Sequence, residues 1–441
     1  MSCNQTLTVG DIAQVFDGPH ATPKKIEAGP YFLSISSLEN GKLDLSKSAH
    51  VSDEDFVKWT RRVTPEEGDI LFSYETRLGE VAMMPAGVTA CLGRRMGLLR
   101  PDRSKILPEY LLYAYQSPAF QETIRSKTIH GATVDRIALK ELPSFPIQVP
   151  PLSEQRKIVD VLKGYDRKLM LNSETNQTLE EMAQTIFKSW FVDFDPVKAK
   201  MNGKQPEGMD AATTSLFPEK LVESELGLIP EGWEVGTLDS HTSMIIDHRG
   251  KTPKKLGSDW VEEGYPAISA KNIKSKKIVR PDTIRFIDEA TYKKWMKEPL
   301  VKGDIIMTSE APMGELYFFD GSEDFCLSQR LYGLRANSDV CSPEFLFNWL
   351  QTTKAKADME GRASGTTALG IKQAELRKVK ILTPPRELLE KYSAVASNLV
   401  DMAAKNNAQN TVLEDLRDTL LPKLLSGEIE LGQAQELAEV E

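Results

Sequence analysis

Two long stretches of the chain repeat apolar or small residues at alternating spacings of four and three positions. The first runs from Ile158 to Trp190 and the second from Tyr392 to Leu420. This spacing predicts a helix with one apolar face, and when it is sustained over several heptads it is typical of a coiled coil. About 39 helical residues would span ~58 Å, which is longer than a small domain is wide. We therefore predict two long helices, over residues 152–192 and 386–427, that pair with each other. The alternative is that each helix packs only on its own globular part.

Polar residues interrupt the apolar seam in the middle of both predicted helices. They are Asn172 and Asn176 in the first helix and Asn406 and Asn410 in the second, at equivalent positions of the two stretches. A polar residue in such a seam fixes the register of pairing at some cost in stability. Matched polar centres allow the two helices to pair antiparallel, so we predict an antiparallel coiled coil whose register these asparagines set.

The segments that precede the two helices are copies of one another. "GDILFSYETRLGEV" at 68–81 and "GDIIMTSEAPMGEL" at 303–316 share six of 14 residues, and each copy ends in a Pro-Pro pair, at 150–151 and 384–385. A repeat unit of half the chain indicates a duplicated domain rather than a solenoid.

Each copy mixes short strands with helices. The runs "DILFSY", "GLLRP" and "FPIQVP" are apolar, partly β-branched and bounded by Gly or Pro, which is typical of strands. "PEYLLYAYQSPAFQETI" has helical spacing after a Pro start. We predict mixed α/β (α+β) globules over 1–151 and 231–385, an irregular connector over 193–230 and an acidic tail over 428–441.

The net charge of −9 argues at first sight against a nucleic-acid partner. The acidic excess, however, lies outside the two globular segments, and residues 249–280 contain nine Lys or Arg against three acids. Phosphate contact requires only a local basic face. No apolar run approaches the ~18 residues of a membrane span, and the N-terminus lacks the pattern of a signal peptide. A cytoplasmic protein without a membrane partner is therefore expected.

The sequence motifs of enzymes that act on nucleic acids are missing. The phosphate-binding pattern G-x-x-x-x-G-K-[ST] is nearly matched at "HRGKTP", but Ile245 stands where the first Gly is needed. The chain contains no N-P-P-[YF] tetrapeptide of amino-methyltransferases and no His or Cys at metal-ligand spacing. These absences favour a binding protein with no catalytic residues and no metal site.

Four segments are similar to those of one known family. They are "PPLSEQRKIVDVL" (150–162), "TIFKSWFVDFDPV" (185–197), "SELGLIPEGWEV" (224–235) and "LRDTLLPKLLSGEIEL" (416–431). Through them the chain resembles, over essentially its full length, the DNA specificity (S) subunit of type I restriction–modification systems. The second copy departs from the pattern because "PPRELLEKY" lacks the Glu-Gln that follows the first Pro-Pro pair.

The resemblance implies that each globule is a target recognition domain reading one half of a bipartite site in double-stranded DNA. It implies that the helices set the spacing and dock two methyltransferase (M) subunits, which restriction (R) subunits can join. The chain itself would be non-catalytic and hold no cofactor, since S-adenosylmethionine, and ATP with Mg where a restriction subunit joins, would bind the partners. Two alternatives are an S-like structural adaptor that does not read DNA and a stand-alone methyltransferase or nuclease fusion.

Positions that differ between the copies inside their shared frame are candidates for reading bases. Arg94 faces Gln329 in the repeat, and arginine suits the two acceptors of guanine while glutamine suits adenine. Tyr74 and Arg77 likewise differ from their counterparts. The alternative for each position is solvent-facing variation, or for Arg94 a phosphate contact.

Three further groups are candidate contacts. The predicted phosphate contacts are the basic residues Arg249, Lys251, Lys254, Lys255 and Lys271, with Thr133 and Thr367. The two threonines precede predicted helical stretches, where free amides suit phosphate, although plain N-capping explains them equally well. The predicted partner-docking surface consists of Phe187, Trp190 and Phe191, which an isolated helix pair would expose. Burial of these rings against the connector is the alternative.

Overall fold

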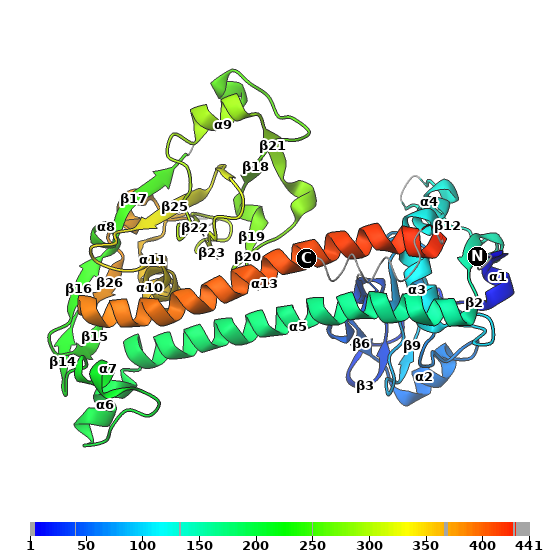
Figure 1. The fold of residues 1–441 in the computed structure, drawn as a ribbon, viewed down its shortest axis with the longest axis horizontal. Coiled ribbons are helices and arrows are strands. Elements are labelled where there is room, and N and C mark those ends of the chain that lie inside the picture. The colour runs from blue at the N-terminus through cyan, green and yellow to red at the C-terminus, as the bar shows by residue number, and fades with distance from the viewer. Residues whose placement is uncertain are drawn as a thin grey trace. The chain divides into compact units, whose positions relative to one another are not determined.

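A computed structural model of the chain describes residues 5–39, 41–131, 134–248, 250–365, 369–426 and 428. The chain divides into two compact units. Unit 1 is residues 1–172 with 408–441, and unit 2 is residues 173–407. Two long helices, α5 (Leu152–Phe191) and α13 (Arg386–Ser426), contribute to both units (Figure 1). Their bounds agree with the predicted ranges to within a residue.

Unit 1 is built on an antiparallel four-stranded sheet. Its strand order is β2 (Ala13–Asp17), β10 (Met96–Pro101), β7 (Ile70–Ser73) and β8 (Val81–Met83). Ile70 and Phe72 face a core formed with the helices α3 (Pro108–Gln116) and α4 (Pro118–Ser126), whereas Leu71 between them belongs to a second core on the other face. The period of two in a strand thus places successive apolar residues in two different cores.

Smaller elements complete the globule of unit 1. A three-stranded sheet has the order β6 (Ala49–His50), β3 (Ile26–Phe32) and β9 (Ala90–Cys91), and α2 (Asp53–Trp59) packs on it. The remaining elements are α1 (Val9–Ile12) and the pairs β1 (Gln5–Thr8) with β13 (Pro146–Val149), β4 (Leu38–Glu39) with β5 (Lys42–Leu43), and β11 (Thr128–Ile129) with β12 (Arg136–Ile137).

Unit 2 repeats this topology, which confirms the duplicated domain. Its four-stranded sheet has the order β17 (Thr242–Asp247), β25 (Leu331–Ala336), β22 (Ile305–Thr308) and β23 (Leu316–Phe318). The three-stranded sheet is β21 (Arg285–Ile287), β18 (Tyr265–Ile268) and β24 (Cys326–Leu327). Two strand pairs and five helices follow the same plan: β16 (Glu234–Thr237) with β26 (Lys380–Thr383), β19 (Ile273–Lys274) with β20 (Lys277–Ile278), α8 (Leu238–His241), α9 (Glu289–Trp295), α10 (Pro343–Leu350), α11 (Thr353–Arg362) and α12 (Gln373–Leu376).

The Asp of the repeated "GDI" segment explains part of the shared sequence. In unit 2 the guanidinium of Arg335 donates to both carboxylate oxygens of Asp304, at 2.9 and 2.7 Å, and the Asp304 side chain is 1 % exposed. In unit 1, Arg100 donates to Asp69 in the same way, at 3.0 and 2.7 Å. Each Asp also accepts the backbone N–H three residues upstream. A buried bidentate pair thus ties β7 to β10 and β22 to β25.

The single helix predicted over 108–124 is two helices in the structure. α3 ends at Gln116 and α4 begins at Pro118, with the hydroxyl of Ser117 accepting the N–H of Phe120 as an N-cap. Proline lacks the N–H that a continuous helix needs and its ring clashes with the preceding turn, so the helix breaks there. The strands predicted at "DILFSY", "GLLRP" and "FPIQVP" are confirmed as β7, β10 and β13.

The long helices pair antiparallel within each unit. In unit 1 the beginning of α5 (Ile158, Leu162) shares a core with the end of α13 (Leu420, Leu424). In unit 2 the end of α5 shares a core with the beginning of α13. Each core also contains residues of a globule, so the helices pair with each other and pack on the globules at the same time.

The four asparagines of the seam meet as predicted. The amide nitrogen of Asn172 donates to the oxygen of Asn410 at 2.8 Å in unit 1. In unit 2 the nitrogen of Asn406 donates to the oxygen of Asn176, also at 2.8 Å. In the repeat, Asn172 corresponds to Asn406 and Asn176 corresponds to Asn410. The two hydrogen bonds are therefore equivalent, and the contacts have the same twofold repetition as the sequence. That these bonds fix the register stays a prediction.

The spacing of three and four from Tyr392 places Val395 and Met402 in the predicted seam of α13, and this part of the prediction is wrong. Val395 and Met402 are 41 % and 50 % exposed, whereas Leu389, Tyr392 and Ala396 are buried. The buried stripe therefore runs through a small residue, Ala396, next to the position that the spacing indicated. The small side chain of alanine gives little apolar signal in the sequence. Its burial is decided by the side chains that pack over it in the folded chain.

The connector is not irregular, contrary to the prediction. It contains α6 (Asp195–Met201), α7 (Ala211–Ser215) and the hairpin β14 (Leu221–Ser224) with β15 (Gly227–Pro230). Phe194, Val197 and Phe217 of the connector are buried in the core of unit 2. Pro196 in the first turn of α6 and Asp210 as the N-cap of α7 explain why such short helices form. Of the predicted acidic tail, only Glu428 is among the described residues.

Among the described helices, none is both long enough and apolar enough to cross a membrane.

Candidate nucleic-acid interface

Loops from three parts of unit 1 meet at one end of its four-stranded sheet. The N–H of Tyr74, just after β7, donates to the carbonyl of Arg95 at 3.3 Å, and the N–H of Thr76 donates to the carbonyl of Asp135 at 3.1 Å. Glu75 and Arg136 also form an isolated β-bridge. We call residues 74–80 and 92–95 the tip loops of unit 1.

The tip loops of unit 1 contain two non-glycine residues with left-handed backbone. Thr76 has φ of 70° and Arg95 has φ of 69°. A β-branched residue in this region is an outlier that costs of order 1–3 kcal/mol. The Arg95 guanidinium lies 2.9 Å from the Glu75 carboxylate and donates to the Thr76 hydroxyl at 3.1 Å. These contacts hold the strained loop in place.

Unit 2 has the same arrangement at residues 309–315 and 327–330, its tip loops. Ala311 and Arg330, the counterparts of Thr76 and Arg95, have φ of 54° and 70°. Arg330 lies 2.8 Å from Glu310, and the N–H of Ser309 donates to the carbonyl of Arg330 at 2.9 Å. Strain that persists at functional sites is part of how they are preorganised. Both copies therefore keep the same left-handed positions in this loop.

Arg94 and Gln329, the predicted base readers, are exposed and each precedes the left-handed arginine of its tip loop. Their backbone positions are therefore matched, while their side chains differ. The structure places them where a ligand could reach them, and base reading by them stays a prediction.

Tyr74 is buried, which contradicts the prediction that it reads bases, whereas Arg77 is half-buried and bonded within the loop, so base reading by Arg77 stays a prediction. Tyr74 is 4 % exposed, and burial raises the pKa of its hydroxyl to about 12. Arg77 donates to the carbonyl of Ile35 at 3.1 Å and to Glu80 at 3.0 Å, so its side chain braces the loop.

The basic segment of unit 2 divides into exposed and internal lysines. Lys251 is half-buried and its ammonium donates to the carbonyl of Trp295 at 2.9 Å, so it supports the fold. Lys254, Lys255 and Lys271 are exposed and remain candidates for phosphate contact. Beside Lys251, His248 is buried, and this burial together with the Lys251 charge lowers the pKa of the imidazole to about 4. His248 is therefore neutral near neutral pH and adds nothing to the basic face. Arg249 lies outside the described residues.

The proposed phosphate threonines, Thr133 and Thr367, also lie outside the described residues. In unit 1 strand β12 follows in place of the helix expected after Thr133, whereas in unit 2 a four-residue helix, α12, does follow. In unit 1 this segment pairs with the tip loop through Glu75 and Arg136, so its backbone groups are used for a β-bridge rather than a helix.

The aromatic residues at the end of α5 do not form an exposed docking surface. Phe187 and Phe191 are 4 % and 0 % exposed, and Trp190 is half-buried. The Phe191 ring centroid lies 5.0 Å from that of Phe345 on α10 and 5.1 Å from that of Tyr392 on α13. The prediction of exposure considered an isolated helix pair, but the connector and the globule cover this end.

Several residues that shape the tip loops were missed as functional candidates. They are the left-handed Thr76, Arg95, Ala311 and Arg330, and the glutamates that pair with the arginines, Glu75 and Glu310. Through these ion pairs the glutamates hold the loops that follow β7 and β22. The sequence did contain a sign of these ion pairs, because the glutamate and the arginine are identical in both copies. Among the described residues, no group of three or more His, Cys, Asp or Glu side chains could hold a metal ion.

Comparison with known proteins identifies the family. The family described as "Type I restriction modification DNA specificity domain" matches twice, over residues 1–181 and 230–414. The chain is 27% identical to the type I restriction enzyme HindI specificity subunit of Haemophilus influenzae, covering 90% of this chain and 94% of that protein. It is 24% identical to the type I restriction enzyme MjaIX specificity subunit of Methanocaldococcus jannaschii, covering 95% and 88%.

A solved structure shares the fold. The crystal structure of the type I restriction–modification S subunit from M. genitalium superposes with a TM-score of 0.54, at 15% identity, over 96% of both chains. The two matches to the family correspond to the two structural copies, each with the long helix that follows it. The chain therefore belongs to the family of type I restriction modification DNA specificity domains.

Proposed function

We propose that this chain is the DNA specificity subunit of a type I restriction–modification complex. Each globule reads one half of a bipartite site in double-stranded DNA through its tip loops. The observation that carries this assignment is the pair of left-handed residues that both copies hold at the same loop positions, beside exposed residues that differ. Two similar but non-identical readers on a duplicated frame are suited to a two-part asymmetric site.

The chemistry of modification belongs to partner subunits in this proposal. Two methyltransferase subunits supply adenine methylation with S-adenosylmethionine, and restriction subunits with ATP and Mg join them in a full complex. The specificity chain contributes DNA contact and geometry and no catalytic group. A cytoplasmic location follows from a DNA-bound role and stays a prediction. The named functions of the relatives do not favour the adaptor alternative.

Substitution of Arg94 by glutamine tests base reading in the first half-site. Arginine recognises guanine through two acceptors, so Arg94→Gln is expected to relax or switch the preference at one position of that half-site only. The expected loss of discrimination is ~1–3 kcal/mol, or roughly 5- to 150-fold. The measurement is genome-wide mapping of methylated adenines in cells that carry the variant complex.

Two further variants make this experiment specific. Gln329→Arg changes the matched position of unit 2 and is expected to alter the second half-site and leave the first unchanged. Arg125→Gln removes an exposed arginine of α4 in unit 1, outside the tip loops, and is expected to leave both half-sites unchanged. A uniform decrease of methylation by Arg94→Gln, with the sequence preference retained, would assign Arg94 to a phosphate instead.

Lengthening both long helices tests whether they set the gap between the half-sites. Because Asn176 pairs with Asn406, one heptad is inserted after Asn176 and a matching heptad directly before Asn406. Seven helical residues add ~10 Å, or about three base pairs at ~3.4 Å each. We expect methylated sites with a longer unspecified gap and unchanged half-sites. Altered half-sites with an unchanged gap would contradict this role for the helices.

A further inference from the structure

The hairpin β19–β20 of unit 2 has an unusual turn. Its two central residues, Ser275 and Lys276, both have left-handed backbone, with φ of 50° and 64°. Two-residue hairpins of this type favour Asn-Gly because both central residues need positive φ. The equivalent turn of unit 1 has the sequence Asn40-Gly41, and Gly41 has φ of 81°. Unit 2 thus holds a lysine at a backbone position where unit 1 has glycine.

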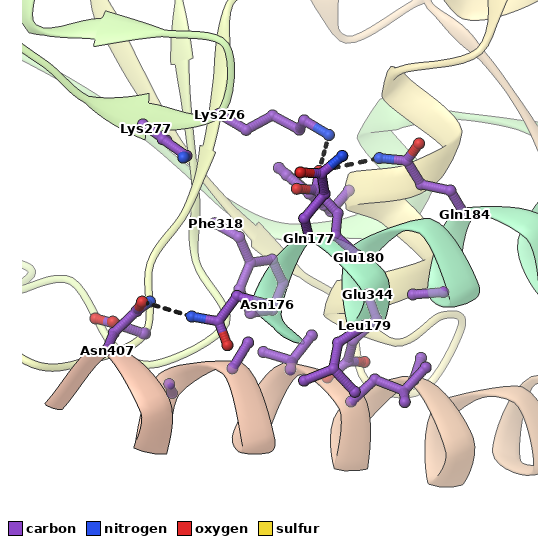
Figure 2. Close-up of a pocket in the computed structure, with 18 of the residues that line it drawn as sticks. Asn176, Gln177, Leu179, Glu180, Gln184, Lys276, Lys277, Phe318, Glu344 and Asn407 are labelled. Carbon is purple, nitrogen blue, oxygen red and sulfur yellow. Dashed lines mark hydrogen bonds and ion pairs between the residues drawn. The ribbon is translucent and has the colours of Figure 1, made fainter. Parts of the chain in front are cut away.

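Two contacts hold the strained turn. The N–H of Ser275 donates to the carboxylate of Glu315 at 2.8 Å, and Glu315 is the last acidic residue of the repeated "GDI…GE" segment. The ammonium of Lys276 pairs with Glu180 on α5, and Glu180 also accepts the side-chain amide of Gln184 at 3.0 Å. Figure 2 shows the Lys276 side chain extending from the hairpin to Glu180. Lys276 therefore has two roles: its backbone adopts the unfavourable left-handed conformation, and its side chain contacts α5.

An open cleft of about 760 Å³ lies between the globule of unit 2 and its part of the helix pair. Its walls come from residues 173–184 of α5, residues 396–407 of α13, the hairpin at Lys276–Ile278, and Phe318 and Phe347 of the globule (Figure 2). Beyond the cleft, the globule joins the helices through the buried aromatic rings around Phe191. Lys302 and Asp401, 2.7 Å apart, form a second polar contact between globule and helix.

We propose that Lys276 and Glu180 form a latch that holds the second globule on the helix pair, with Lys276 as a positioning residue for the second half-site. With the latch closed, the globule contacts α5 at the hairpin and α13 through Lys302 and Glu344, in addition to the aromatic core. With the latch open, the hairpin is free of α5, and the globule keeps the aromatic core and its contacts with α13. This proposal rests on the proposed function, because the consequence of an open latch is a wider range of accepted gap lengths.

The latch is suited to fine adjustment rather than to holding the fold together. The Lys276 and Glu180 side chains are 31 % and 45 % exposed. Ion pairs of this exposure shift an equilibrium by up to about fivefold. Burial of the Lys276 ammonium and, next, its repulsion by Lys356 and Lys277 lower the pKa of Lys276. The carboxylate of Glu180 is the opposite charge that the ammonium contacts. Loss of Glu180 leaves a partly buried ammonium among like charges.

The test uses the full chain and the assembled modification complex. Lys276→Gly removes the latch and gives the turn the glycine of unit 1, whereas Glu180→Ala removes the latch and leaves the turn unchanged. Lys277→Ala is the control, because it removes the neighbouring exposed charge and keeps the latch. A double variant, Lys276→Glu with Glu180→Lys, restores an ion pair of reversed polarity.

Two measurements separate the latch from the proposed function. Amide hydrogen exchange in residues 273–278 of the DNA-free chain is expected to rise about two- to fivefold in Glu180→Ala, and to remain near the wild-type rate in Lys277→Ala and in the charge-reversed pair. Methylation of a site library with gaps one base pair shorter or longer is expected to rise severalfold in both Lys276→Gly and Glu180→Ala, with half-site sequences unchanged.

Unchanged exchange in Glu180→Ala overturns the latch. Raised exchange with an unchanged gap profile shows that the contact is only structural and overturns the positioning role. If Lys277→Ala widens the range of accepted gaps as much as Glu180→Ala does, the effect comes from the net charge of the hairpin and not from the ion pair. That result also overturns the proposal. If the wild-type complex methylates no bipartite site, the proposed function fails, while the exchange measurement still decides whether the latch exists.

Discussion

Substitution of Asp304 by alanine is expected to destabilise unit 2 by about 3–5 kcal/mol. Removing one partner of a buried ion pair leaves the other charge without compensation, which accounts for losses of this size. Asp304 is 1 % exposed and accepts two hydrogen bonds from Arg335 and one from the N–H of Val301. The Arg335 side chain is 23 % exposed, so water can solvate part of its charge after Asp304 is removed. We therefore expect a loss of stability at the lower end of this range.

The duplication supplies an internal control for this prediction. Asp69→Ala removes the equivalent carboxylate and is expected to destabilise unit 1 by a similar amount. Asp324→Ala removes an exposed acid of unit 2 and is expected to change stability by less than about 0.5 kcal/mol. The measurement is amide hydrogen exchange against denaturant, read separately in α3 for unit 1 and in α10 for unit 2. Equal losses in both units from Asp304→Ala alone would contradict the assignment.

The other large effect is expected from Phe191→Ala, which should destabilise unit 2 by about 3–5 kcal/mol. The Phe191 ring is fully buried and contacts Phe187, Trp190, Trp233, Phe345 and Tyr392. Its removal opens a cavity where α5, α13, α10 and the connector meet, and these elements cannot all collapse into it. Denaturant unfolding monitored in α10 measures the loss.

This substitution also separates structural from docking roles. Phe191→Leu keeps most of the buried volume and is expected to cost clearly less than Phe191→Ala. Met182→Ala removes a 48 % exposed side chain from the same helix and is expected to leave the stability of unit 2 nearly unchanged. A docking surface would behave differently. Phe191→Ala would then retain wild-type stability and lose only co-purification with the methyltransferase subunit, and that result would overturn our account of the cluster.

The misassigned residues share one cause. Tyr74 was selected because it differs between the copies, and the rings of α5 because they lie at the end of a predicted helix; both criteria are local. Whether such a side chain is exposed depends on segments distant in sequence: Phe345 of α10 and Tyr392 of α13 pack against Phe191. Arg94 and Gln329, by contrast, are exposed in their tip loops.

The sequence by itself determined the duplicated domain, the two long helices and the meeting of the four asparagines. These features are periodic or repeated along the chain, so comparison of the chain with itself finds them. Only the tertiary structure decided that two left-handed residues recur in the tip loops, that the aromatic rings of α5 are buried, and that Lys276 reaches Glu180. A backbone angle and a contact across about 100 residues leave no period in the sequence. They arise from packing between segments whose approach is set by the whole fold.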